Sequence, residues 1–401
     1  MKIGILREGK SIPDKRVPFT PSHVQKIIQN HPEVSFWVQP SPHRCFPDSA
    51  YLEVGATVQE DLSNCDFLFN VKEMDIPRLI PNKPHFFFSH TIKEQPYNQK
   101  LLRALLNQKC AMVDYEIMVD EQGARLVAFG KFAGIVGAYN GLLAFGKRTK
   151  TFSLKPAHQS AGYNAIVEQV KSSKIPSIKI AVTGSGRVAK GAIQFLTDAG
   201  VPQVSVEDYL HDHFETPVFA NILAKDYLIH RETKKYDRSV YHQYPEQFES
   251  QFAPFWQSTD LMINCIYWDN RAPKFFSLED IQSLDFKISV IADVSCDING
   301  SIPCTQRAST IAKPVYGFDA VSGKETAPYQ EGGIDIMAVD NLPCELPSDA
   351  SSEFGDYLIE FVIPALLKDG LDDAMIQRAT ICRDGRLTDR FMYLKNYSEG
   401  I

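Results

Sequence analysis

The chain has 401 residues and a formal net charge of −7 at pH 7, with 44% hydrophobic and 23% charged residues. A chain of this length is too long for a single ordinary hydrophobic core, so we expect two domains. The composition is typical of a globular protein. The negative charge provides no general attraction to nucleic acid or to an anionic membrane. Because the start MKIGILREGK is charged and no run of about 18 apolar residues occurs, we expect a cytoplasmic protein that is neither exported nor inserted into a membrane.

The cysteine and histidine positions indicate neither a disulfide framework nor a metal site. The eight cysteines are widely scattered, with no CxxC pair and no Cys/His spacing typical of zinc ligands. The HDH motif supplies His211 and His213 in a polar stretch without a third ligand. Reduced thiols and no bound metal are therefore expected.

The first third of the chain alternates short apolar runs with segments of helical periodicity. Strands are predicted for five runs rich in β-branched or aromatic residues: KIGILR, VSFWVQ, CDFLFNV, HFFFSH and CAMVDYEIM. Helices are predicted for HVQKIIQNH and QPYNQKLLRALLNQK. This alternation predicts the α/β class, with a parallel sheet covered by helices.

A long helix, predicted from FAGIVGAYNGLLAFGKR, separates this series from a second one. Buried strands of the second series are predicted for IKIAV, DLMINCIYW and KISVIADVS. Residues 208–256 are polar, aromatic and poorly periodic, so we interpret them as a surface insertion. Near the end, SSEFGDYLIEFVIPALLKDG predicts a helix in which Pro364 can introduce a kink. The apolar face of that helix comprises Phe354, Leu358, Phe361 and Leu366.

The segment TGSGRVAKGA lies between the strand IKIAV and a predicted helix, the context in which glycine turns bind a dinucleotide pyrophosphate. Gly184 permits a tight turn, Gly186 lets the backbone approach a phosphate, and Ala189 allows the helix to pack closely on the strand. The helix N-terminus adds free N–H groups with partial positive charge. The turn therefore predicts a site for NAD or NADP.

The ribose contact and the choice between the two cofactors stay open at this stage. Glu207 or Asp208, roughly 20 residues beyond the turn, can hold the adenosine ribose. An acid at that place favours NAD because it repels a 2′-phosphate, whereas Arg187 beside the turn favours NADP.

Four stretches of the first domain end or follow a predicted strand, where open α/β sheets bind ligands. They are LREGKSIPDKRVPFTP, NVKEM, FFFSHTIKEQ and DYEIMVDEQGARLVAFGKFAGIVGA. Together they supply the charged candidates Arg16, Lys72, Glu73, His90, Lys93, Glu116 and Arg125.

These stretches resemble the alanine dehydrogenase and transhydrogenase superfamily, and within it the lysine-forming saccharopine dehydrogenases and the lysine-ketoglutarate reductase part of the bifunctional lysine-degrading enzyme. The similarity continues through TGSGRVAKGA, INCIYWDNRAP, IADVSCDINGSI and MAVDNLPCELPSDASSEFGDYL, so it covers nearly the whole chain. It implies reversible reductive condensation of L-lysine with 2-oxoglutarate to saccharopine. The implied partners are NAD or NADP and small amino and oxo acids, while the oligomeric state stays open.

The resemblance also implies two Rossmann-like domains with parallel sheets and an active-site cleft between them. In that superfamily the dinucleotide domain is inserted into the substrate domain. The implied boundaries are a substrate domain over residues 1–136, a dinucleotide domain over 137–343, and C-terminal helices over 344–401 that return to the first domain. On this pattern the glycine turn lies mid-chain because the first part of the substrate domain precedes the inserted dinucleotide domain in the sequence.

By the same resemblance, Lys72 and His90 match the family's acid/base pair. The amine substrate must lose a proton near neutral pH, and a desolvated Lys and a His both titrate in a useful range. The positions that match substrate contacts are Arg16, Glu73, Gln95, Glu116, Arg125, Phe129, Ser295, Cys296 and Asp297. The positions that match cofactor contacts are Gly184, Gly186, Arg187, Asp208, Tyr267, Val294, Val339, Asp340, Asn341 and Leu342. The arginines would hold carboxylates, and Glu73 and Glu116 would moderate the acid/base pair.

The sequence departs from the fungal branch at two places. Ala124 stands where that branch has the first of two adjacent arginines. Val188 stands where fungal enzymes have a cysteine that can pair with the one matching Cys265, so that disulfide cannot form here, and Cys265 is interpreted as a small buried residue.

Two alternatives stay open. One is a different amino-acid substrate, as in alanine dehydrogenase, and the other is a non-catalytic nucleotide-sensing protein on the same fold. The presence of both Lys72 and His90 favours an enzyme.

Overall fold

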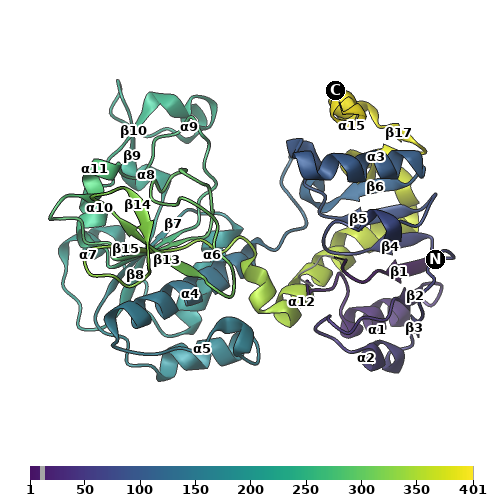
Figure 1. The fold of residues 1–401 in the computed structure, drawn as a ribbon, viewed down its shortest axis with the longest axis horizontal. Coiled ribbons are helices and arrows are strands. Elements are labelled where there is room, and N and C mark those ends of the chain that lie inside the picture. Colours follow the sequence, from purple (N-terminus) through teal and green to yellow (C-terminus); the bar gives the residue numbers. More distant parts are fainter. Residues whose placement is uncertain (10–13, 401) are drawn as a thin grey trace. The chain divides into compact units, whose positions relative to one another are not determined.

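The computed structural model describes residues 1–9 and 14–400, and the chain forms two compact units (Figure 1). Unit 1 comprises Met1–Phe129 and Pro347–Ile401, and unit 2 comprises Gly130–Leu346. Unit 2 is thus inserted, in sequence, between two parts of unit 1. The first boundary precedes helix α4 (Gly130–Thr149) rather than falling inside it at residue 136, because α4 packs against elements of unit 2.

The described residues of unit 1 form an eight-stranded sheet in the order β17-β16-β6-β5-β4-β1-β2-β3. Its strands are β1 (Lys2–Ile5), β2 (Ser35–Val38), β3 (Thr57–Val58), β4 (Phe67–Phe69), β5 (Pro84–Phe87), β6 (Ala111–Asp114), β16 (Thr380–Arg383) and β17 (Arg386–Leu387). Strands β1 to β6 pair in parallel, whereas β16 pairs antiparallel with β6 and with β17. The C-terminal part of the chain therefore returns to unit 1 as a sheet edge as well as helices.

Successive strand residues point to opposite faces of this sheet, and each face has its own core. Phe86 of β5 shares a core with Val24, whereas Phe87 shares the other core with Leu102. The first face is covered by α1 (Pro21–Asn30), α2 (Asp48–Glu53), α12 (Pro347–Tyr357), α13 (Ile363–Lys368) and α14 (Ala374–Ala379). The second is covered by α3 (Gln99–Asn107) and α15 (Lys395–Glu399).

The C-terminal helical segment changes its winding just before Pro364. A π-helical stretch, Leu358–Val362, joins α12 to α13, and Pro364 lies in the first turn of α13, where a missing N–H costs little. The predicted face residues that are buried are Phe354, Leu358 and Leu366. Phe361 is not part of this core, because the wider turn shifts the register and buries Val362 instead.

The described residues of unit 2 form a seven-stranded sheet in the order β14-β13-β15-β12-β11-β7-β8. Its strands are β7 (Lys179–Thr183), β8 (Val218–Ile222), β11 (Leu261–Asn264), β12 (Val290–Asp293), β13 (Val315–Asp319), β14 (Lys324–Thr326) and β15 (Ile334–Met337). All pair in parallel except β13 and β14. Besides α4, its helices are α5 (Tyr163–Ser172), α6 (Arg187–Asp198), α7 (Val206–His211), α8 (Ala224–Tyr227), α9 (Arg238–Gln243), α10 (Ala253–Ser258) and α11 (Leu278–Ile281).

The interpretation of residues 208–256 as a surface insertion is wrong. This segment contains β8, which pairs with β7, and a separate antiparallel pair formed by β9 (Leu228–His230) and β10 (Phe248–Ser250). Its residues in the core of unit 2 include Tyr209, Tyr227, Phe248, Phe252 and Trp256. Helices and strands of only a few residues alternate here, so no single period marks the buried positions in the sequence.

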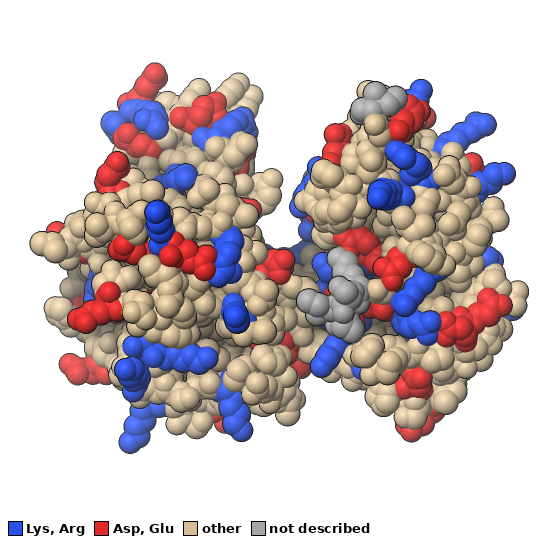
Figure 2. All heavy atoms as spheres, in the orientation of Figure 1, with Lys and Arg blue, Asp and Glu red and all other residues tan. Residues whose placement is uncertain are grey.

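The hydrophobicity of the helices, the surface charges, the cysteines and the possible metal ligands all limit the partners that the chain can have. Although α4 has 20 residues, neither it nor any other helix among the described residues is long and apolar enough to cross a membrane. On the face shown in Figure 2, Lys and Arg side chains are interspersed with Asp and Glu on both units. All eight cysteines are free thiols. Within residues 1–9 and 14–400, no group of three or more His, Cys, Asp or Glu side chains is arranged to hold a metal ion.

Helices α4 and α6 approach each other closely enough that their glycines are required. A Cβ atom on Gly134 of α4 would overlap the backbone of Val188, and one on Gly191 of α6 would overlap the backbone of Lys131. The contact therefore fixes α6, and with it the glycine turn before it, against the long helix.

We expect Gly191→Ala to lower the free energy of unfolding by about 1–3 kcal/mol, because the added methyl group forces the two helices apart. Helix propensity alone favours Ala by about 1 kcal/mol, so a net loss isolates the helix contact. Urea denaturation followed by circular dichroism measures the change. Lys190→Ala, at an exposed position of the same helix, is the control and should stay within about 0.5 kcal/mol of wild type. A Gly191→Ala protein as stable as wild type would contradict the contact.

Candidate active site

In unit 1 the predicted site residues follow the carboxyl ends of four neighbouring parallel strands. These ends meet at one edge of the sheet, where open α/β sheets bind ligands. In chain order they are Arg16 after β1, Lys72 and Glu73 after β4, His90 and Gln95 after β5, and Glu116, Arg125 and Phe129 after β6. Residues 10–13 of the first charged stretch lie outside the described residues.

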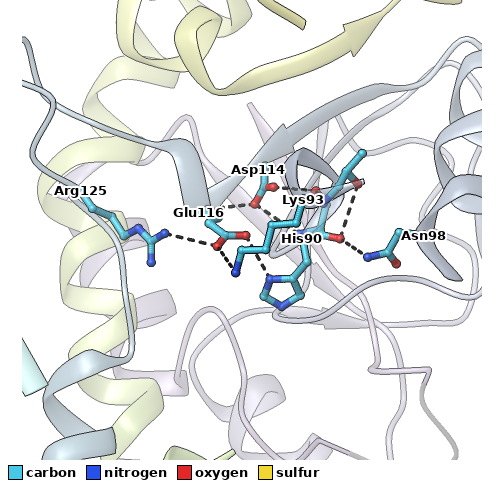
Figure 3. A network of polar contacts seen from close by, with 8 residues as sticks. His90, Lys93, Asn98, Asp114, Glu116 and Arg125 are labelled. Atoms are coloured by element: carbon cyan, nitrogen blue, oxygen red, sulfur yellow. Dashed lines mark hydrogen bonds and ion pairs between the residues drawn. The ribbon is translucent and has the colours of Figure 1, made fainter. Parts of the chain in front are cut away.

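Glu116 is the centre of a polar cluster at this edge (Figure 3). Its Oε2 lies 3.1 Å from Nδ1 of His90, and its Oε1 lies 3.3 Å from Nζ of Lys93 and 3.5 Å from Nη2 of Arg125. The Glu116 side chain is 8% exposed, whereas those of Lys93 and Arg125 are 55% and 44% exposed. One buried carboxylate thus gathers an imidazole and two cations that remain open to solvent.

These contacts keep Glu116 ionised and determine which proton His90 carries. Burial raises the pKa of Glu116, but the His90 hydrogen bond and the charges of Lys93, His90 and Arg125 outweigh it and lower the pKa to about 2. An anion beside Nδ1 favours the tautomer with the proton on Nδ1, which leaves Nε2 as an acceptor. His90 in this state can act as a general base.

Asp114, which the sequence analysis did not single out, braces the ends of β5 and β6. Its Oδ2 accepts a hydrogen bond from Oγ of Ser89 at 2.6 Å, and its Oδ1 accepts from the backbone N–H groups of Ser89 and Glu116 at 3.2 and 2.8 Å. The Ser89 carbonyl accepts from Nδ2 of Asn98 at 2.8 Å. Burial raises the pKa of Asp114 to about 6. This carboxyl group therefore fixes Ser89, the residue before His90, relative to the backbone of Glu116.

The backbone of His90 is in the left-handed region, with φ at +51°. This conformation is uncommon for a residue with a Cβ atom and persists where the surroundings fix it. The fixing contacts are on both sides, since Asp114 holds Ser89 and the N–H of Thr91 donates to Oγ of Ser89 at 3.1 Å. With this backbone, the His90 ring lies within hydrogen-bond distance of Glu116.

Arg16 is buried and paired with a neighbouring carboxylate. Its Nε and Nη2 donate to Asp14 at 3.0 and 2.6 Å, and its guanidinium lies 4.2 Å from the ring centroid of Phe129. Phe129 in turn stacks on Phe354, with ring centroids 4.4 Å apart. Because Asp14 occupies two of its donor nitrogens, Arg16 does not present its whole fork to a substrate. Arg125, which is half-exposed, is the better placed of the two predicted carboxylate-binding arginines.

Lys72 and Glu73 lie on a turn held by side chains around it. The Lys72 N–H donates to Oε2 of Glu8 at 3.0 Å, and the Lys72 carbonyl accepts from Nδ2 of Asn70. Burial raises the pKa of Asp14, but Arg16 and then the charge of Lys72 lower it below its ordinary value. The predicted acid/base residues therefore lie at one sheet edge, His90 beside Glu116 and Lys72 on the turn that Glu8 and Asn70 hold.

The remaining predicted substrate residues of unit 1 have structural contacts. Glu73 is buried and lines a cavity of about 530 Å³ together with Tyr97 and Lys100. The Gln95 carbonyl accepts a hydrogen bond from the hydroxyl of Tyr397, which ties the turn after β5 to the C-terminal helix α15.

In unit 2 the positions predicted to contact the cofactor follow the carboxyl ends of parallel strands, with one exception. They are Gly184, Gly186 and Arg187 after β7, Tyr267 after β11, Val294 after β12, and Val339, Asp340, Asn341 and Leu342 after β15. Tyr267 is 96% exposed, whereas Val339 and Leu342 are buried. The exception is Asp208.

The glycine turn fits a pyrophosphate group. Gly184 has a φ of +98°, and Gly186 is the N-cap of α6, where an added Cβ would meet no atom within 4 Å. The backbone there is open to an approaching phosphate, and the first N–H groups of α6 have no partner within the helix. Ala189 is fully buried, as close packing of α6 on the sheet requires.

The structure does not bring Glu207 or Asp208 to the glycine turn. Both lie in α7, where the Tyr209 carbonyl accepts a hydrogen bond from Nζ of Lys179, the first residue of β7. Gly184 follows the last residue of the same strand, so the two acids lie towards the opposite end of the sheet. The spacing of about 20 residues pointed to the wrong position for the ribose contact, because the short helix α7, and not the neighbouring strand β8, follows α6.

A buried polar network joins the carboxyl ends of β7, β11 and β12. Oγ1 of Thr183 donates to Oδ1 of Asn264 at 2.9 Å, and Nδ2 of Asn264 donates to Oδ1 of Asp293 at 2.9 Å. Oγ of Ser295 donates to the same Asp293 oxygen at 2.7 Å, and Oγ1 of Thr305 donates to the other at 2.6 Å. The network fixes Ser295, a predicted substrate contact, relative to the strand that precedes the glycine turn.

The segment that follows Ser295 continues to the surface. Cys296 has a φ of +56°, and burial raises the pKa of its thiol, as it does for Cys265, so neither is a thiolate at neutral pH. Asp297 is exposed and lines a cavity of about 570 Å³ with Tyr267. One predicted substrate position and one predicted cofactor position therefore share a cavity within unit 2.

The sequence matches two family descriptions, "Alanine dehydrogenase/PNT, N-terminal domain" over residues 4–136 and "Alanine dehydrogenase/PNT, C-terminal domain" over residues 159–390. The chain belongs to the alanine dehydrogenase/PNT family. It is 30% identical to the alpha-aminoadipic semialdehyde synthase, mitochondrial, of Mus musculus over 99% of this chain and 48% of that protein. It is 27% identical to the saccharopine dehydrogenase (NAD(+), L-lysine-forming) of Emericella nidulans over 92% of each chain. This family member thus spans about half the length of the mouse relative.

Solved structures agree with the predicted fold. An L-alanine dehydrogenase superposes with a TM-score of 0.66 at 16% identity, covering 100% of this chain and 99% of that one. A transhydrogenase from Sinorhizobium meliloti gives a TM-score of 0.58 at 14% identity, covering 97% and 100%. The prediction of an α/β alanine dehydrogenase/PNT family member with two Rossmann-like domains is confirmed.

In this family member we expect Glu116→Gln to reduce stability at neutral pH and to have less effect in acid. The pKa of folded Glu116 lies below its ordinary value of 4.5, so ionised Glu116 contributes stability that is present above about pH 4.5 and is lost as the pH falls towards about 2. The difference in free energy of unfolding between wild type and Glu116→Gln should therefore shrink from about pH 5 to about pH 3. Urea denaturation across this range measures it, with Glu121→Gln at an exposed position as control. A difference that stays constant with pH would contradict the charge cluster.

Proposed function

We propose that the chain is an NAD(P)-dependent oxidoreductase that condenses L-lysine with 2-oxoglutarate and reduces the product to saccharopine, in a reversible reaction. The observation that carries the proposal is the Glu116 cluster, in which a buried carboxylate holds His90 and leaves Lys93 and Arg125 open to solvent. The name of the Emericella nidulans relative, a lysine-forming saccharopine dehydrogenase, supports the choice of substrates.

The proposed reaction needs groups that move protons near neutral pH. The ε-amine of lysine is an ammonium ion with an ordinary pKa of about 10.4, so a base must take its proton before it attacks the keto carbon. Water then leaves the adduct with help from an acid. His90 serves as one of these groups, because Glu116 holds its Nδ1 and directs proton exchange to Nε2. Lys72 serves as the other, because it lies at the same sheet edge, on the turn after β4.

Charge complementarity assigns the substrate groups. The half-exposed guanidinium of Arg125 suits a carboxylate of the oxo acid, which it can bind with two parallel hydrogen bonds. Lys93 adds a second cation beside the same Glu116. The buried carboxyl group of Glu73 suits an ammonium group of the amine substrate.

The glycine turn would hold the cofactor's pyrophosphate against the N-terminus of α6, with Gly184 and Gly186 supplying the open backbone. When bound, a reduced nicotinamide supplies the hydride that reduces the imine. Since Asp208 lies away from the turn, the ribose contact falls to the residues after β8, the strand next to β7. Arg187, the first residue of α6, suits a 2′-phosphate.

The test of the proposal is oxidation of NADH and of NADPH with a panel of amines and oxo acids. Lysine with 2-oxoglutarate should give the highest kcat/KM, with a product whose mass is that of saccharopine. Higher kcat/KM with pyruvate and ammonia would assign the chain to alanine dehydrogenase chemistry instead. No turnover with any pair, together with cofactor binding, would favour the nucleotide-sensing alternative.

We expect His90→Gln to lower kcat at least about 100-fold, because general acid–base catalysis contributes factors of this size. The fold should remain, since Gln keeps a hydrogen-bond donor near Glu116. The matched control is His31→Gln, which alters a histidine outside the cluster and should leave kcat unchanged. Unchanged turnover by a folded His90→Gln protein would remove His90 from the mechanism.

Arg125→Met should raise the KM for 2-oxoglutarate at least about 10-fold, because a bidentate charge-assisted pair to a carboxylate is lost. The KM for the cofactor should not change, since the glycine turn belongs to the other unit. Arg125→Lys keeps the charge but not the fork and should give an intermediate KM. Arg386→Met, at an exposed position of β17, is the control. Equal KM values for wild type and Arg125→Met would contradict the assignment.

A further inference from the structure

Glu8 is a carboxyl group at the candidate site that the proposed reaction does not use. It follows β1, at the sheet edge that also carries Lys72. Its Oε1 accepts the backbone N–H of Val71 at 2.6 Å, and its Oε2 accepts that of Lys72 at 3.0 Å. One planar group thus holds two successive N–H groups, which fixes the turn on which Lys72 is carried.

Titratable and charged groups from several segments face Glu8. The segment after β4 contributes the backbone N–H of Lys72, and η4 (Tyr115–Ile117) contributes Tyr115, whose pKa is raised by burial and by the Glu8 charge. The loop after β2 contributes His43 and Arg44, which line a small cavity of about 10 Å³ together with Glu8. The other residues with charge at this cavity are Arg7, Asp14 and Arg16.

These cations are largely engaged by other carboxylates. Arg7 pairs with Glu60, Arg44 with Asp48, and Arg16 with Asp14. Burial and the charge of Asp14 raise the pKa of Glu8 to about 8, so Glu8 carries a proton at neutral pH.

The surroundings can accept that proton in a hydrogen bond. Two buried oxygens of this region, Asn70 Oδ1 and Tyr115 Oη, have no hydrogen-bond partner among the described residues. Asn70 lies beside the turn because its Nδ2 donates to the Lys72 carbonyl. The cavity of about 10 Å³ has room for about one water molecule, which can bridge such groups.

We propose that Glu8 is a positioning residue for Lys72: its two hydrogen bonds fix the turn that carries Lys72, and its own proton controls how much negative charge faces the Lys72 side chain. The role of Lys72 as a proton-transfer group rests on the proposed function, whereas its positioning by Glu8 does not.

The charge balance explains the direction of this control. The charge of Lys72 lowers the pKa of Asp14, and the charge of Asp14 in turn raises the pKa of Glu8, so the two carboxyl groups and Lys72 interact electrostatically. When Glu8 loses its proton, a second anion faces Lys72 and stabilises the ammonium form.

The first experiment measures the free energy of unfolding from about pH 5 to about pH 8 for wild type and Glu8→Gln. The pKa of folded Glu8 is raised, so its contribution to stability is complete below the ordinary value of 4.5 and is lost as the pH rises towards about 8. Wild type should therefore lose stability relative to Glu8→Gln as the pH rises. Glu53→Gln, on the exposed end of α2, should show no such trend. A wild-type curve parallel to that of Glu8→Gln would overturn the protonation of Glu8.

The second experiment needs no substrate. Lys72 in each protein is labelled with an amine-reactive reagent, and its labelling rate is followed by mass spectrometry against pH. The wild-type profile should bend near pH 8 as Glu8 ionises, and the Glu8→Gln profile should not. Lys100, which is exposed in α3, should label alike in both proteins. Identical Lys72 profiles would overturn the proposal whatever reaction the chain catalyses.

The third experiment separates positioning from simple stabilisation. Glu8→Gln loses one of the two acceptors and should lower kcat about 10- to 100-fold with an unchanged KM for the cofactor. Glu8→Asp keeps a titrating carboxyl group on a shorter arm, so its kcat falls while its pH–rate profile keeps the wild-type alkaline limb. If the pH–rate profile of Glu8→Gln, scaled to the wild-type kcat, superimposes on the wild-type profile, the proposed control of charge at Lys72 by Glu8 is overturned. Absence of turnover in wild type would instead count against the proposed function alone.

Discussion

The parallel pairing of β1, β4, β5 and β6 is the constraint on which the candidate site depends. Parallel strands bring every following loop to the same sheet edge, so residues from four distant parts of the sequence lie along one edge. Asp114 strengthens this edge by bonding the loop after β5 to the start of the loop after β6. The left-handed backbone of His90 is stable because this frame surrounds it.

Buried carboxyl groups organise the charges at that edge. Glu116 holds His90, Lys93 and Arg125, while Asp14 holds Arg16. A buried anion is tolerated only with cations or donors around it, so each carboxylate fixes the places of its partners. The Glu116 cluster and the Asp14–Arg16 pair differ in the exposure of their arginines. Arg125 remains half-exposed, whereas Arg16 is covered by Phe129.

Sequence reasoning predicted the parts of this structure that follow from local patterns. The parallel strands of unit 1 and the glycine turn before α6 follow from short apolar runs and from one glycine motif. It failed where contacts between distant segments determine the structure. The edge strand β16 and the burial of residues 208–256 depend on such contacts, and the distance of Asp208 from the glycine turn depends on the position of α7. Asp114 could have been found as an acid ending a buried strand, but the contacts of Glu8 with Val71 and Lys72 join segments that no local pattern connects.

The insertion of unit 2 between two parts of unit 1 also sets the order in which the units become complete during translation. All of Gly130–Leu346 leaves the ribosome before Pro347, so unit 2 has its whole core while unit 1 still lacks α12, α13 and β16. For that time β6 is a bare strand edge, and the sheet face that later packs on Phe354 and Leu358 is uncovered. During this interval the unfinished sheet of unit 1 presents an unpaired edge and an apolar face, both of which favour aggregation of the nascent chain.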